Sequence, residues 1–379
     1  MKKFLLVMCF SMAAVMMFSP AYAMEVGPVH GPGGDEGLAA GALPPAGFYF
    51  INDFVMLPTL ITYGPLFDYN FEGGPVPTHT LGPGGAHVPV KNQEGISNEK
   101  LIAIVDAPIL LWVPGCKFLG ADYGVAIAEP FDYTNLNVMV GGLNVGGGPL
   151  GNTNTVVGGA QMGASNTVLV PYILSWHLPC DWRIKTALSV LVPDATTSTG
   201  NRIRSTDAVT NQAFSQRGNS DGGIYAESGQ DFWSFTPEIG ISYLHAGWNF
   251  SADFFLSFST KNNDTNYQSG DIFAADYTIT YTCGKWTFGL GAYEQNQLNS
   301  DSFVQPSGQV GGDGIVGNGL YQSQPGTKLT AYGIGPIVGY NFGPCSLMFV
   351  YNVPLESDNL ANGESILVRL VVPLGKLGM

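Results

Sequence analysis

The stretch Trp248–Phe258, WNFSADFFLSF, alternates between two kinds of side chain. One alternate set is apolar and would line one face of a β-strand: Phe250, Ala252, Phe254, Leu256 and Phe258. The other set is mostly polar: Asn249, Ser251, Asp253 and Ser257. Because this second face is too polar for a dry core, the pattern predicts a strand that separates an apolar phase from an aqueous one.

The same alternation recurs on both sides of this stretch, over residues 233–243, 273–282 and 286–293. Counted along the chain, twelve strands are expected, near 46–57, 98–112, 118–129, 167–178, 182–193, 232–245, 248–260, 271–283, 285–298, 328–342, 345–355 and 365–373. Bacterial membrane barrels have an even strand number, with short turns on one side and long loops on the other. Connections here alternate in that way, with tight turns near 113–117, 179–181, 246–247, 284 and 343–344 and longer ones near 58–97, 130–166, 194–231, 299–327 and 356–364. Only the loop near 261–270 is of middling length.

Composition agrees with an exterior that faces lipid. Charged residues make up 12% of the 379 residues, about half of the usual 25% in a soluble domain. The net charge of -14 argues against a nucleic-acid partner, which needs a basic face. A periplasmic β-sandwich is the alternative. It would also alternate, but the six tryptophans all fall near expected strand ends, as in the aromatic girdles of a membrane barrel.

The domain boundaries follow from the N-terminal segments. Residues 1–23 have a charged start, an apolar run at 4–18 and the small-x-small site Ala21-Tyr22-Ala23, which predicts a signal peptide. Residues 24–45 are rich in Gly and Pro, and they are either a plug inside the barrel or a disordered periplasmic tail. Leu38 and Leu43 give this segment apolar side chains to bury. Residues 46–379 would form the outer-membrane barrel of a Gram-negative bacterium.

Several motifs carry a family resemblance. They are GLAAGALPPAGFYF, WVPGCKFLGADYG, LSWHLPCDW, ISYLHAGWNFSADFFLSF, NNDTNYQSGDIFAADYTITY, GKWTFGLGAYEQNQLNSDS and AYGIGPIVGYNF. Together they resemble the phenol meta-pathway degradation protein family, also called the SphA-like family, over about residues 37–373. The resemblance implies an outer-membrane β-barrel that acts as a channel for small hydrophobic or aromatic compounds.

Ionisable residues on the polar faces are the candidates for lining the lumen: Asp106, Asp122, Arg183, Lys185, Glu238, Asp253, Asp276 and Arg369. Arg183, Lys185 and Arg369 are expected to pair with inward carboxylates. These charges either stabilise the barrel interior or contact the solute. Twelve strands enclose more space than a filled eight-stranded barrel and less than a porin, which favours a selective or plugged passage.

Four cysteines of the mature chain fall at expected periplasmic turns: Cys116, Cys180, Cys283 and Cys345. An even count in an oxidising compartment predicts two disulfides, with Cys116–Cys180 and Cys283–Cys345 as the closest pairs. Neighbouring turns lie roughly 10 Å apart, which exceeds the usual Cα separation unless the turns lean together. Metal binding is disfavoured because no CxxC spacing is present.

No catalytic constellation and no cofactor site is expected. His79 and His87 could reach the outer rim, but they lie in a turn-rich loop. A structural or adhesive barrel with surface loops remains the alternative to a channel, and a barrel hydrolase is the weaker one. The expected partners are outer-membrane lipid, small hydrophobic or aromatic solutes and the assembly machinery. The chain ends on Met379 rather than on an aromatic residue, which bears on insertion efficiency more than on fold.

Overall fold

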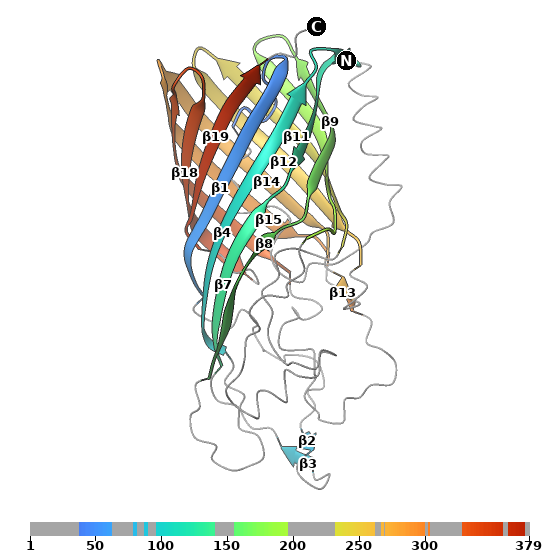
Figure 1. Ribbon diagram of the computed structural model, residues 1–379, viewed down its shortest axis with the longest axis vertical. Helices are drawn as coiled ribbons and strands as arrows, with labels where there is room; N and C mark the ends of the chain where they lie inside the picture. The colour runs from blue at the N-terminus through green and yellow to red at the C-terminus, as the bar shows by residue number, and fades with distance from the viewer. Residues whose placement is uncertain are drawn as a thin grey trace.

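The computed structural model describes residues 38–62, 79–81, 87–89, 96–140, 155–195, 232–261, 267–268, 270–299, 302–303, 328–358 and 363–375. Most of these residues form one large antiparallel sheet that curves into a barrel (Figure 1). Twelve strands make the closed wall: β1 (Gly47–Thr62), β4 (Ile96–Val113), β6 (Ala121–Ala128), β9 (Val168–His177), β10 (Trp182–Leu191), β11 (Ser234–His245), β12 (Trp248–Ser259), β14 (Ile272–Cys283), β15 (Trp286–Gln297), β17 (Thr330–Asn341), β18 (Ser346–Asp358) and β19 (Ser365–Gly375).

Two pairings close the barrel. The first and last strands, β1 and β19, are antiparallel neighbours, with Asp53 opposite Arg369. The strand β4 then pairs with β6, where Trp112 lies opposite Val125. These pairings confirm the predicted twelve-stranded barrel. In the part of the chain that the structure describes, no helix is long and apolar enough to cross a membrane.

The remaining strands are β2 (His79–Leu81), β3 (His87–Pro89), β5 (Lys117–Phe118), β7 (Phe131–Val140), β8 (Thr155–Ala164), β13 (Tyr267–Gln268) and β16 (Ser302–Phe303). Of these, β5, β7 and β8 extend the sheet of the wall, whereas β2 with β3 and β13 with β16 form two separate two-stranded sheets. The prediction of one loop over 130–166 was wrong at both ends, because β7 and β8 occupy them. Pro130 lacks the N–H of a ladder bond and suggests a strand end. Its carbonyl nevertheless accepts a 2.8 Å hydrogen bond from the Ser165 amide, and pairing resumes beyond it.

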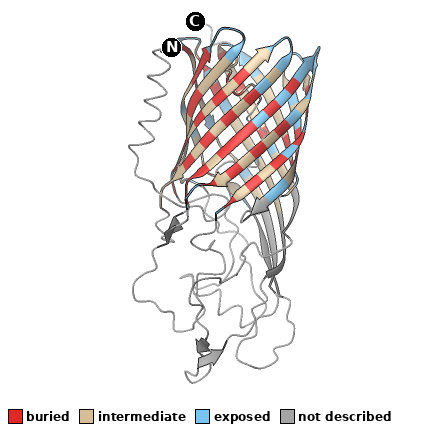
Figure 2. Ribbon diagram, turned by 180° about the vertical axis from the view of Figure 1, so that it is seen from behind, coloured by how far each residue is buried: buried red, intermediate tan, exposed pale blue. Residues whose placement is uncertain are grey.

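Side chains alternate between the two faces of the wall, as Figure 2 shows by burial. On β12 the buried positions are Ser251, Asp253, Phe255 and Ser257, and these face the interior. Outward residues are large and apolar, with Phe250 42% and Leu290 54% exposed. Only lipid accommodates so many exposed apolar side chains on a closed barrel.

An aromatic ring surrounds the end of the barrel that carries the short turns. Four pairs of neighbouring strands contribute cross-strand ring contacts, with centroid distances of 5.7 Å for Phe48–Trp112, 5.2 Å for Trp182–Tyr243, 4.9 Å for Trp248–Tyr281 and 4.7 Å for Trp286–Tyr340. Amphipathic rings of this kind gather at the membrane interface. The strand β1 begins and β19 ends at this same end (Figure 1), so the segment that precedes Gly47 approaches the barrel from the short-turn side.

Candidate functional site

The interior wall is divided into a polar arc and an apolar arc. Inward residues of β11, β12 and β14 are mostly hydroxyl or carboxylate side chains, and those that are buried are Ser234, Thr236, Glu238, Ser242, Ser251, Asp253, Ser257, Asp276, Thr278 and Thr280. Across the barrel, β17, β18 and β19 bury Ile337, Val350 and Leu367 against one another. The strands β1 and β4 continue this apolar arc with Tyr49, Leu111 and Val113. Three buried polar side chains interrupt it, and they are Asp53, Asn352 and Ser365.

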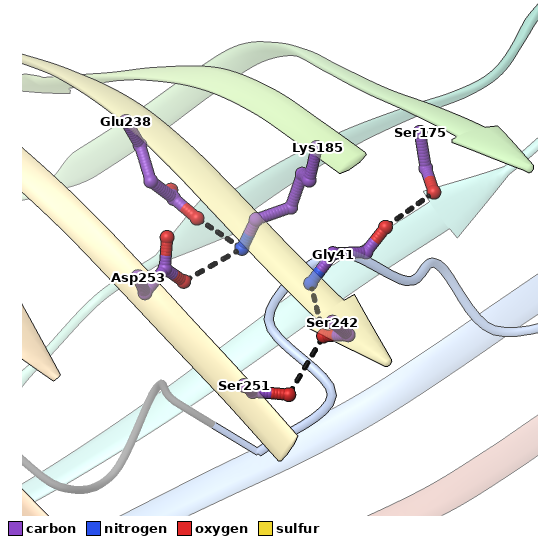
Figure 3. A network of polar contacts seen from close by, with 7 residues as sticks. All are labelled: Gly41, Ser175, Lys185, Glu238, Ser242, Ser251 and Asp253. Atoms are coloured by element: carbon purple, nitrogen blue, oxygen red, sulfur yellow. Dashed lines mark hydrogen bonds and ion pairs between the residues drawn. The ribbon is translucent and has the colours of Figure 1, made fainter. Parts of the chain in front are cut away.

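Lys185 is the cation of the polar arc. Its ammonium group forms ion pairs with Glu238 and with Asp253, the latter at 3.2 Å (Figure 3). Register explains the grouping, because Lys185 lies opposite Gly240 and Gly240 lies opposite Asp253. Gly240 has no side chain between the two charges, so the lysine can reach across β11. All three charged side chains are largely buried, which makes the cluster a fixed part of the wall.

The segment before β1 lies against this polar arc. The Gly41 amide donates a 2.8 Å hydrogen bond to Ser242 Oγ, and Ser175 Oγ donates a 2.7 Å bond to the Gly41 carbonyl (Figure 3). The Ser242 hydroxyl also lies 2.7 Å from that of Ser251. Residues from β9, β11 and β12 therefore hold one glycine of the N-terminal segment inside the barrel.

The contact requires a glycine at position 240, because the backbone of the segment passes close to it. A Cβ at position 240 would collide with the carbonyl oxygen of Ala40 and come within 3.1 Å of Asp253 Oδ1. A Cβ on Gly41 would likewise collide with the Arg183 carbonyl oxygen. Gly240 on the wall and Gly41 in the segment, both without a Cβ, allow the segment to lie flat on the wall.

Two leucines of the same segment insert into the apolar arc. Leu38 packs against the cluster of Ile337, Val350 and Leu367. Leu43 packs against the cluster of Tyr49, Leu111 and Val113, and it also contacts the position of Gly124. The Tyr49 hydroxyl donates a 2.5 Å bond to the Pro45 carbonyl, which fixes the turn into β1. The described part of the segment thus contacts both arcs of the interior.

A second buried ion pair joins the first and last strands. Arg369 Nε and Nη2 donate to the two carboxylate oxygens of Asp53 at 2.7 and 2.6 Å. Such a fork is the strong geometry for an arginine and a carboxylate. Sequence reasoning selected Arg369 but missed Asp53. The signal was present, since Asp53 falls on the inward positions of FYFINDF together with Tyr49 and Ile51.

The structure places most of the predicted lumen residues on the inward face. Asp276 lies directly opposite Asp253, in the row that contains Lys185. Asp122 and Arg183 lie near the short turns, where Asp122 forms ion pairs with Lys117 at 2.9 Å and His177 at 3.1 Å. Arg183 is partly buried and donates to the Trp182 carbonyl at 3.0 Å.

Asp106 was wrongly assigned to the lumen. It lies opposite Phe54 and Phe131, both exposed on the outer surface, and it is itself exposed. On β4 the inward residues are Leu111 and Val113, whose numbers have the other parity. The assignment assumed that a charge in a barrel strand avoids lipid, and here the strand register overrides that preference.

The predicted disulfides are not formed in the structure. Cys116, Cys180, Cys283 and Cys345 are free thiols, and three of them are exposed. Each lies at a different hairpin end, and neighbouring hairpins are separated by about two strand spacings, roughly 10 Å. A disulfide needs Cα atoms within about 7 Å, so pairing would require the turns to move.

These features define a β-barrel of the outer-membrane type, with a lipid-facing exterior and a partly filled interior. The chain belongs to the family described as "Putative MetA-pathway of phenol degradation", which matches residues 81–370. This match confirms the family resemblance seen in the sequence motifs. No curated protein sequence matches the chain.

Several solved structures are similar to this chain at low sequence identity. An outer-membrane channel from Pseudomonas putida F1 is 12% identical, with a TM-score of 0.50 over 88% of this chain and 97% of that chain. The Ralstonia pickettii toluene transporter TbuX is 13% identical, with a TM-score of 0.41 over 94% of this chain and 95% of that chain. A Pseudomonas aeruginosa FadL homologue is 10% identical, with a TM-score of 0.39 over 86% and 90%. The likeness to the Pseudomonas putida channel shows a shared fold.

Proposed function

We propose that this protein is a channel for small hydrophobic or aromatic compounds in the outer membrane of a Gram-negative bacterium. The observation that carries the proposal is the divided interior, in which aliphatic clusters face a wall of hydroxyl groups and paired charges. An aromatic solute can contact the apolar arc while the polar arc keeps water and its own hydrogen bonds. Membership of a family linked to phenol degradation points to the same solute class.

The N-terminal segment 24–45 acts in this proposal as a plug that narrows the passage. Its described part, from Leu38 onward, is anchored by Gly41 on the polar arc and by Leu38 and Leu43 on the apolar arc. Contacts with both sides of the interior are what a constriction requires, whereas a disordered tail needs neither. Residues 1–23 are the signal peptide and 46–379 the barrel. Insertion depends on the outer-membrane assembly machinery.

The buried charges have separate roles in this proposal. Lys185, Glu238, Asp253, Asp276 and Arg369 stabilise the wall, because burial and pairing hold them in place. Asp122 and Arg183 lie at the short-turn mouth, so they meet solutes that leave the barrel.

Two other functions are weaker. A barrel hydrolase needs a histidine aligned with a nucleophile, whereas His177 and His245 sit in exposed pairs with Asp122 and Asp181 at the short turns. We therefore treat the protein as a non-enzyme. A structural or adhesive barrel would need neither the divided interior nor the anchored segment.

Solute flux tests the proposal. Proteoliposomes that contain the mature protein are expected to take up phenol and toluene faster than liposomes with an eight-stranded barrel, whose interior is filled by side chains. The protein should be verified as folded by its heat-modifiable mobility on gels. Equal uptake in the two preparations would contradict a channel and favour an adhesive or structural role.

A further inference from the structure

The outward face of the wall contains a polar pair, Asn52 with Asp106, that a channel does not require. Asn52 on β1 and Asp106 on β4 lie on the same outer face of adjacent strands, and Asn52 Nδ2 donates a 2.7 Å hydrogen bond to Asp106 Oδ1. Around this pair the outer surface is apolar, with Phe54 37%, Leu110 51% and Phe131 42% exposed. The two strands run side by side in Figure 1.

The pair lies within the hydrocarbon region rather than at its edge. Asp106 precedes Trp112 of the aromatic ring by six positions, from 106 to 112. Strands rise about 3.3 Å per residue and tilt by about 40° from the barrel axis. Asp106 therefore lies roughly 15 Å from the aromatic ring along this axis, within an apolar band about 25 Å tall. Another outward carboxylate, Glu294, accepts a 2.6 Å bond from the Tyr277 hydroxyl and lies further from the short turns, eight positions beyond Trp286.

Lipid cannot complete the hydrogen bonds of this pair. After the bond between them, Asn52 keeps a second N–H and a carbonyl oxygen, and Asp106 keeps the oxygen Oδ2. Unsatisfied polar groups are costly in hydrocarbon, and polar side chains there commonly bond across an interface between two membrane segments.

We propose that the Asn52–Asp106 face is the interface through which two copies of this chain form a dimer in the membrane. A twofold interface brings the same patch of each copy together, so Asn52 of one copy can face Asp106 of the other, and the reverse. The patch is complementary to itself, because the spare amide N–H of one copy can donate to Asp106 Oδ2 of the other. The aromatic and aliphatic side chains around it supply the packing surface.

The test measures the oligomeric state of the mature protein in lipid nanodiscs and detergent by native mass spectrometry. Wild type is expected to be a dimer. The variant N52L/D106L is expected to be monomeric, with an apparent dissociation constant at least ten times higher. The exchange N52D/D106N keeps one donor and one acceptor on each copy and is expected to remain dimeric, as is the control Tyr277→Phe, which removes an outward hydrogen bond elsewhere on the wall.

Folding of each variant is checked by heat-modifiable mobility, so that loss of the dimer is not mistaken for loss of the barrel. A monomeric wild type would overturn the proposal, and copurified lipid on that monomer would assign the pair to lipid instead. A folded N52L/D106L variant that stays dimeric would also overturn it.

Discussion

Replacing Gly240 with alanine is expected to raise the single-channel conductance of the mature protein several-fold. The new methyl group would occupy the place of the Ala40 carbonyl oxygen, so the segment around Gly41 could no longer lie on the wall. The strand itself should tolerate alanine, because Gly240 is not one of the described glycines with a positive φ angle. Planar-bilayer recordings of the purified variant measure the effect.

Two further variants separate release of the segment from damage to the wall. The double variant S175A/S242A removes the side-chain partners of Gly41 and should raise conductance in the same direction. Gly339→Ala also adds a methyl group to the inner wall, but its nearest neighbour is Thr287 Cβ at 3.3 Å and not the segment, so conductance should stay unchanged. Unchanged conductance in both Gly240→Ala and S175A/S242A would show that the segment does not restrict the passage.

Replacing Lys185 with methionine is expected to lower the free energy of unfolding by about 3–5 kcal/mol, the usual cost of removing one partner from a buried ion pair. Glu238 and Asp253 would both lose their cation while remaining buried, at 7% and 0% exposure. Denaturant unfolding of the barrel in lipid vesicles measures the change.

A matched pair of controls isolates the buried charge. Lys117→Met breaks the ion pair with Asp122, but the Lys117 side chain is 61% exposed, so the loss should be at most about 1 kcal/mol. Adding Glu238→Gln and Asp253→Asn to Lys185→Met removes the negative charges that Lys185 neutralises and should restore most of the stability. If Lys185→Met and Lys117→Met have equal effects, the Lys185 cluster does not stabilise the wall.

The fold was predictable because its signal is repeated. In a stretch such as Trp248–Phe258, residues that face lipid alternate with residues that face the interior. The twelve expected strands match the closed wall. The ends of strands were less predictable. A loop was expected from residue 130 onward, yet pairing resumes in β7 directly after Pro130.

The interior was predictable only in part. Alternation places Lys185, Glu238 and Asp253 inward, but only the register brings them together across Gly240. The anchoring of Gly41 by Ser175 depends on contacts 134 positions apart, and short-range patterns do not carry such information. Asp106 was assigned to the lumen because a carboxylate avoids lipid. Its register opposite Phe54 instead places it on the outer face.

The most direct test of the central claim compares single-channel conductance of the mature protein with that of a variant lacking residues 24–46, with and without phenol in the bath. We predict discrete conductance steps that are larger in the deletion variant and that phenol reduces in both proteins. A folded, heat-modifiable barrel that shows no conductance in either form, and no response to phenol, would contradict the account.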